Sequence, residues 1–250
     1  MLIRRDARLL AGAPLALAAW LLAACADEAH GQSIADQLAA CQSESARAEA
    51  RISACTRVIE ATDDEEIRTE ALLQRGLVHE TTGNKQAAID DYTEAIKLDP
   101  TSAVPYFNRG NVYDQMADHD RAIADYTAAI KLEPNDADIF NNRGQSYDSK
   151  GDYDKAIADY TQAIRLDRDN ARAFFNRGLA HANKDEFQRA LADLNEAIRL
   201  EPRDADAYVA RAGVQEDLDN PSAARADYTQ ALALEPDHLD AKEGLARLRN

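Results

Sequence analysis

The sequence lacks the residue patterns on which most enzymes and metal proteins depend. It has three cysteines and five histidines in 250 residues, and it contains no HExxH, CxxC, glycine-rich phosphate loop or serine-elbow motif. Such motifs supply metal ligands, phosphate-binding backbone or an activated nucleophile. We therefore expect no enzyme activity, no metal and no cofactor.

Basic residues are also scarce. The chain carries 29 Lys and Arg against 45 Asp and Glu, which gives a formal net charge of −16 at pH 7. Nucleic acids and anionic lipids bind to basic surfaces because their phosphates are negative. The composition therefore argues against nucleic acid as a partner and favours a neutral or basic one.

A segment of thirty-four residues, 137–170, recurs along the chain. Within it, Phe140, Gly144 and Tyr147 fall at i, i+4 and i+7, which places them on one face of a helix. Ala156 and Tyr160 share a face of a second helix in the same way. We expect each segment to form an antiparallel helix pair whose apolar side is buried only when neighbouring pairs stack.

The order of these residues resembles the tetratricopeptide repeat: an aromatic, a glycine four later, an alanine twelve after that, then Tyr, Ala and Pro. The resemblance covers residues 69–238 and implies an all-α, right-handed superhelical solenoid that binds a protein or peptide. No Gly/Ser/Pro-rich linker interrupts the chain, so we expect one domain. Its parts are a linker at 25–32, a degenerate first unit at 33–68, five repeats at 69–102, 103–136, 137–170, 171–204 and 205–238, and a capping helix at 239–250.

Residues 1–24 resemble a signal peptide. Arg4, Arg5 and Arg8 precede an apolar run that is short for a membrane span. The run ends in LAAC at 22–25, which resembles the lipobox of bacterial lipoproteins and implies lipidation of Cys25. An ordinary secretory signal cut near residues 29–31 is the alternative. We expect an exported, periplasmic protein with a lipid anchor in the envelope, or in the alternative a soluble periplasmic or secreted one.

The two remaining cysteines lie in the degenerate first unit. Alignment with the next repeat places Cys41 and Cys55 at the positions of Arg75 and Ile89, on the facing sides of one helix pair. We expect a Cys41–Cys55 disulfide, which an exported protein would retain; two buried free thiols are the alternative.

Two charged series recur at the repeat period. Every full repeat has an arginine in its first helix and an aspartate sixteen residues later in its second. We expect these to pair, within a repeat or between neighbours, and to fix the register of the helices rather than bind a ligand. This arginine–aspartate ladder consists of Arg75, Asp91, Arg109, Asp125, Arg143, Asp159, Arg177, Asp193, Arg211 and Asp227.

An amide precedes the arginine in four of the five repeats, until Ala210 interrupts the series. The series resembles the asparagine ladder with which some relatives hold an extended peptide main chain, since an amide both donates and accepts. A polar face that binds nothing is the alternative. The expected partner-binding groove is acidic, includes Glu70, Asp114, Asp148, Asn183 and Asp206, and has Phe107 and Phe175 as exposed anchors. Its central residues are Gln74, Phe107, Asn108, Asn111, Asn141, Asn142, Arg172, Phe175 and Asn176.

These features predict a non-catalytic scaffold or adaptor of the bacterial envelope that binds a protein or peptide in its concave groove. The alternative is a self-associating structural spacer in the periplasm that dimerises through its C-terminal end. A small-molecule or glycan sensor would need a dedicated pocket, which the sequence does not supply. An enzymatic activity in the degenerate first unit is suggested by nothing except its two cysteines.

Overall fold

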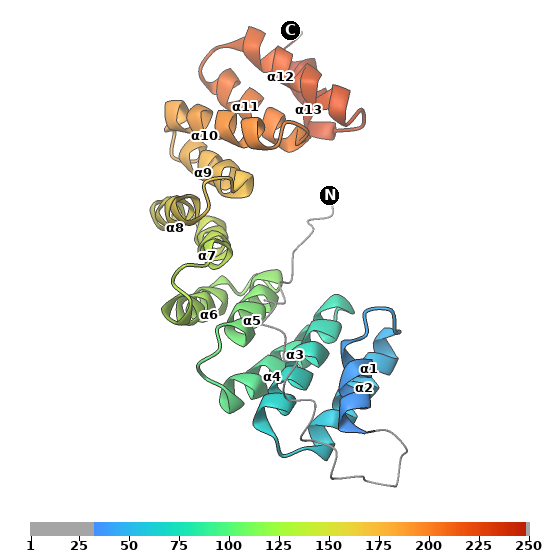
Figure 1. The fold of residues 1–250 in the computed structure, drawn as a ribbon. Helices are drawn as coiled ribbons and strands as arrows, with labels where there is room; N and C mark the ends of the chain where they lie inside the picture. The colour runs from blue at the N-terminus through green and yellow to red at the C-terminus, as the bar shows by residue number, and fades with distance from the viewer. Residues whose placement is uncertain (1–32, 249–250) are drawn as a thin grey trace. The chain divides into compact units, whose positions relative to one another are not determined.

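The computed structural model describes residues 33–248 and shows an all-α protein (Figure 1). Those residues form 13 helices and no strand. This confirms the predicted all-α class of helix-pair repeats. In the part of the chain that is described, no helix is both long enough and apolar enough to cross a membrane.

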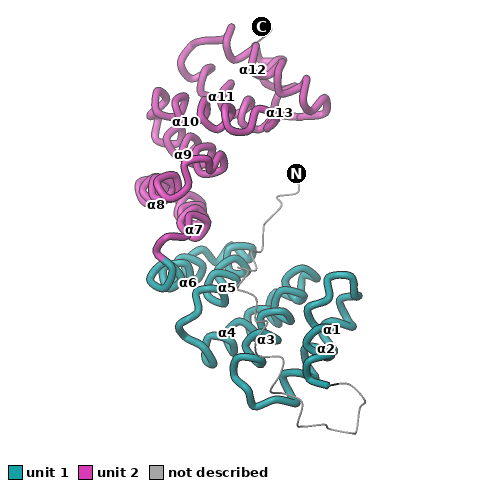
Figure 2. Tube along the Cα trace, viewed as in Figure 1, with its two compact units in different colours: residues 1–133 teal, residues 134–250 magenta. Residues whose placement is uncertain are grey.

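The chain divides into two compact units, one ending at Glu133 and the other beginning at Pro134 (Figure 2). The sequence predicted one domain because no linker is present. In a repeat array each pair contacts only its neighbours, so a boundary between two repeats can separate it into compact halves without a linker.

The first unit holds three helix pairs, in which each helix packs against the next. Its helices are α1 Ile34–Gln42, α2 Ala48–Ala61, α3 Glu65–Thr81, α4 Lys85–Leu98, α5 Val104–Gln115 and α6 His119–Leu132.

The second unit holds three further pairs and a final helix. Its helices are α7 Ala137–Ser149, α8 Tyr153–Leu166, α9 Ala171–Ala182, α10 Phe187–Leu200, α11 Ala205–Asp217, α12 Pro221–Leu234 and α13 Leu239–Arg247. The last of these lies against α12 and α11, within the range predicted for the capping helix.

The core of the first three full repeats contains a contact between a glycine and a tyrosine. A Cβ atom on Gly76, Gly110 or Gly144 would lie 2.6–2.9 Å from Cε1 of the tyrosine in the second helix of the same repeat. Tyr92, Tyr126 and Tyr160 are buried there. The two helices can approach this closely only because glycine has no side chain.

The turns inside the repeats share one backbone conformation. Gly83 and Gly151 have φ of 82° and 78°, in the left-handed region that glycine tolerates. Ala117, Asp185 and Asp219 occupy the same place with φ of 54–59°. The repeat therefore keeps its turn even where the sequence has lost the glycine.

The structure contains a Cys41–Cys55 disulfide that joins α1 to α2. Both cysteines are fully buried and pack with Ala54, Val58 and Ala71 of the first core cluster. On the chain-entropy model, a loop of this length adds about 3 kcal/mol to the free energy of unfolding. The bond therefore closes the helix pair that has no earlier neighbour among the described residues.

The glycine–tyrosine contact can be tested with Gly144→Ala. We expect this change to lower the free energy of unfolding by about 1–2 kcal/mol, because overpacking outweighs the gain in helix propensity. The matched control is Gly213→Ala in α11, where an added Cβ meets nothing within 4 Å. That control should raise the free energy of unfolding by about 0.5–1 kcal/mol. Urea denaturation measures both, and equal stabilisation by the two changes would contradict the contact.

Candidate partner-binding surface

The arginine–aspartate ladder pairs the two helices of each repeat. Every arginine bonds the aspartate sixteen residues later, with N–O distances of 2.6–2.8 Å in all five pairs. The aspartate side chains are only 7–9% exposed. Hydrogen bonding to the aspartate raises the pKa of Arg109, Arg143 and Arg211, so these groups stay charged.

Four of the arginines also contact the preceding helix pair. Each uses its remaining terminal nitrogen to donate to a side-chain oxygen on the second helix of that pair. The acceptors of Arg75, Arg109, Arg177 and Arg211 are Thr56 at 2.8 Å, Thr93 at 2.8 Å, Thr161 at 3.0 Å and Asn195 at 2.6 Å. Because these donors are engaged within the protein, the ladder connects and aligns the repeats. It is therefore not the partner-binding surface.

In the first unit, the predicted groove residues are already bonded to the protein itself. Gln74 is buried, donates to Glu70 at 2.9 Å and accepts from Arg51 at 3.3 Å. Asn111 accepts a hydrogen bond of 2.7 Å from the Tyr126 hydroxyl. Both amides therefore have an internal structural role.

Asn108 differs from its neighbours in this unit. Its side chain is only 7% exposed, and its Oδ1 atom has no hydrogen-bond partner among the described residues. A buried acceptor without a donor is costly in a folded protein.

The prediction that Phe107 and Phe175 are exposed anchors is wrong for Phe107. Its side chain is buried, and its ring centre lies 6.0 Å from that of Tyr126. Phe107 therefore turns toward the second helix of its own repeat. Phe175 is half-buried and packs against a cluster that includes Leu194 and Val214.

The second unit brings four predicted groove residues together on α7 and α9. Arg172 donates to Asn142 Oδ1 at 2.9 Å, and Asn176 donates to Asn141 Oδ1 at 3.2 Å. If the Asn141 amide is turned over, its oxygen lies 2.8 Å and 3.0 Å from two nitrogens of Arg172. The Asn141 amide thus lies between Arg172 and Asn176 and can bond in either orientation.

These four residues, Asn141, Asn142, Arg172 and Asn176, form what we call the amide–arginine cluster. Asn141 is fully buried, so it supports the cluster and cannot itself face a ligand. Asn142 and Asn176 are half-buried and Arg172 is exposed. The cluster therefore presents amide donors and acceptors beside one cation, which is the chemistry needed to bind a peptide main chain.

His181 and Glu186 form a pair that the sequence did not predict. His181 takes the place of Tyr147, is buried, and has its Nδ1 2.7 Å from Glu186 Oε2. Its Nε2 lies 3.8 Å from Asp193 of the arginine–aspartate ladder. The signal for this pair was a histidine at an aromatic position with a carboxylate five residues later, across the turn.

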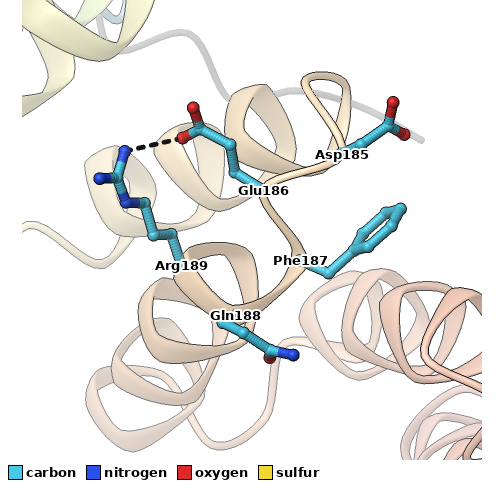
Figure 3. A pocket seen from close by; sticks show the side chains of 5 residues that line it. All are labelled: Asp185, Glu186, Phe187, Gln188 and Arg189. Atoms are coloured by element: carbon cyan, nitrogen blue, oxygen red, sulfur yellow. Dashed lines mark hydrogen bonds and ion pairs between the residues drawn. The ribbon is translucent and has the colours of Figure 1, made fainter.

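A hollow lies beside this turn, lined by residues 185–189 (Figure 3). Glu186 and Arg189 bond across one side of it, and the Phe187 ring stands on the other. None of the predicted groove residues lines the hollow.

The predicted lipidation site, Cys25, lies outside the described residues, as does the whole signal segment.

Family models place the chain among known repeats. Models described as tetratricopeptide repeat match residues 103–136, 125–158, 171–204 and 205–238, and a model described as TPR repeat matches 76–116 and 144–185. Together they span 76–238, more than half of the sequence. The chain belongs to the tetratricopeptide repeat family, whose members are in general protein-interaction scaffolds.

Solved structures share this fold at low sequence identity. YrrB, titled a TPR protein with an unusual peptide-binding site, has 22% identity and a TM-score of 0.64, over 77% of this chain and 97% of its own. MamA from Desulfovibrio magneticus has 17% identity and a TM-score of 0.65, over 70% of this chain and 98% of its own. A thermophilic TPR protein from Thermus thermophilus has 20% identity and a TM-score of 0.57, over 72% of this chain and 98% of its own. No curated protein matches the sequence.

The His181–Glu186 pair makes a pH prediction. The hydrogen bond with His181 is the largest cause that lowers the pKa of Glu186, from 4.5 to about 2, and Arg189 and Lys184 add to it. Because the pKa is lower in the folded state, ionised Glu186 stabilises the fold above about pH 4.5. That stabilisation is lost as the pH falls through about 2.

We expect His181→Phe to move the pKa of Glu186 upward, measured by carbon NMR titration of its carboxyl group. Glu196 is the internal control, since its pKa is lowered by a hydrogen bond with Arg199 instead. An unchanged Glu186 titration in the variant would show that His181 is not the cause.

Proposed function

We propose that the protein is a non-catalytic adaptor that binds a peptide or protein segment along the first helices of its repeats. The amide–arginine cluster carries this proposal. Its Asn142 and Asn176 amides are held within hydrogen-bond distance of other polar groups while remaining partly exposed. Preordered amides bind a main chain with little further loss of conformational freedom.

Asn108 in the first unit does not share this role, because its Oδ1 atom is buried, as the Asn141 side chain is. It belongs to the same sequence series as Asn142 and Asn176, one before the ladder arginine of its repeat. The proposal therefore rests on the amides of the second unit that remain partly exposed.

A photo-crosslinking experiment tests the groove. A photoreactive residue at Asn183, an exposed position at the end of α9, should form an adduct in an envelope extract from the host. The same residue at Ala158, an exposed position of α8, is the control and should not. We expect the double change Asn142→Ala and Asn176→Ala to reduce the Asn183 adduct about tenfold, because removing an anchoring contact costs at least about 1.4 kcal/mol.

Other outcomes would contradict the adaptor. An adduct unaffected by the two asparagine changes would exclude the amide groups as the binding surface. An adduct with twice the mass of the chain would instead identify self-association, the structural-spacer alternative. Leu239, whose side chain is 71% exposed at the start of α13, is the feature that favours that alternative.

We also propose that the adaptor works in the bacterial envelope and is anchored through Cys25. The support is the sequence alone: a basic start, an apolar run and the LAAC motif at 22–25. The buried Cys41–Cys55 disulfide is compatible with an oxidising compartment.

Intact mass of the protein from host membranes, measured without reductant, tests the anchor. We expect a species that begins at Cys25 with added acyl mass and is two hydrogens lighter than the reduced chain. The soluble periplasmic fraction is the control and should be depleted of the protein. A soluble species that begins near Gln32 would refute the anchor, and free thiols would refute the disulfide.

A further inference from the structure

A helical glycine in α11 has no packing partner in the described structure. Glycine destabilises a helix relative to alanine, so it usually marks a place where something approaches the backbone closely. In the described helices, Gly76, Gly110, Gly144, Gly178 and Gly244 each have a side chain within 2.9 Å of where a Cβ would lie. Gly213 has nothing within 4 Å. Gly213 therefore leaves open space on the surface of α11, and the residue itself is partly exposed.

The open position at Gly213 lies between two apolar clusters. Val209 and Ala210 precede it by four and three residues, so all three share one face of α11. Val209 packs with the cluster around Tyr228, and Ala210 packs with the cluster of Ala190, Leu194 and Val214. Gly213 is thus a gap in an otherwise apolar surface.

Residues of α9 link this gap to the amide–arginine cluster. Asn176 bonds Asn141 of α7 on one side. Its neighbour Phe175 packs against the same cluster as Ala210 on the other. A chain segment held by Asn142 and Asn176 would cross Phe175 and reach Gly213.

Apart from the exposed Arg172, the charges considered on the same faces are acidic. Asp148 follows Asn141 by seven residues on α7, and its Oδ1 atom is buried without a hydrogen-bond partner among the described residues. Burial raises the pKa of Asp148, as expected for a carboxyl group without a cation. On α11, Glu216 and Asp217 lie one turn beyond Gly213. Of these two carboxylates, only Glu216 has an arginine partner among residues 33–248, Arg247 at 2.9 Å.

We propose that the second unit binds an extended segment with alternating apolar and basic residues, and that an apolar side chain of this segment packs on Gly213 between Phe175 and Val209. The segment's lysine or arginine side chains then face Asp148 and Asp217. This inference rests on the proposed function, because the Asn142 and Asn176 amides hold the main chain of the segment.

Synthetic peptides test the inference with the full chain, by fluorescence anisotropy at about 0.15 M salt, where remote charges are screened. The probe is a labelled peptide that alternates lysine and leucine. The two comparison peptides alternate lysine with serine and glutamate with leucine. We expect the lysine–leucine peptide to bind at least about tenfold more tightly than either, since each comparison removes one kind of contact.

Gly213→Leu is the decisive variant. It leaves the net charge unchanged and fills open space, so we expect unaltered or raised thermal stability and about tenfold weaker binding of the lysine–leucine peptide. Gly213→Gln is a second blocking variant in case the leucine disturbs folding. Gly213→Ala, which adds a single methyl group, is the matched control. It should bind the lysine–leucine peptide more tightly than Gly213→Leu or Gly213→Gln does.

The outcomes separate this inference from the proposed function. If Asn142→Ala weakens binding but both blocking variants leave it unchanged, the Gly213 site is refuted and the amide site stands. If the blocking variants weaken binding and Asn142→Ala does not, the apolar contact stands and the amide contact fails. Equal binding of the lysine–serine peptide, or no binding of the lysine–leucine peptide, would overturn the inference.

Discussion

The guanidinium group of each ladder arginine holds the repeats in place. It bonds an aspartate on the second helix of its own repeat, and within each unit it also bonds a hydroxyl or amide of the preceding pair. The planar fork of an arginine suits this task because its donors point in fixed directions. A buried pair of this kind adds little net stability, since desolvation offsets the attraction, but it disfavours other registers.

Because register is fixed by the ladder and, in three repeats, by the glycine–tyrosine contact, the residue before the ladder arginine is free to vary. The residue before the ladder arginine is Gln74, Asn142 or Ala210 with no change in the surrounding helix pair. That separation explains how one framework can present amides on α7 and α9 and an apolar gap on α11. It also explains why the fold itself identifies no partner.

The sequence predicted what depends on contacts repeated at one spacing. Gly144 against Tyr160 and Arg177 against Asp193 are such contacts, and periodicity places both residues on facing helices. The burial of Phe107 was not predicted, because the repeat position that it shares with Phe175 was assigned to the open groove, and its ring instead packs near Tyr126. The His181–Glu186 pair depends on the turn conformation at Asp185, which has a positive φ without a glycine to signal it.

The contact that joins one repeat to the next is the same at successive boundaries within each unit, so it sets no limit on the number of repeats. A duplicated internal repeat would find its threonine acceptor already in place. The two outermost elements depart from this pattern. In the first unit, Cys41 replaces the ladder arginine, and a covalent bond closes the pair that has no earlier neighbour among residues 33–248. In the second unit, α13 places Leu245 where the next arginine would stand, so the arginine series stops at Arg211 within the described residues. Repeats can therefore be added in the interior of either unit, whereas the first pair and α13 do not carry the arginine that extends the series.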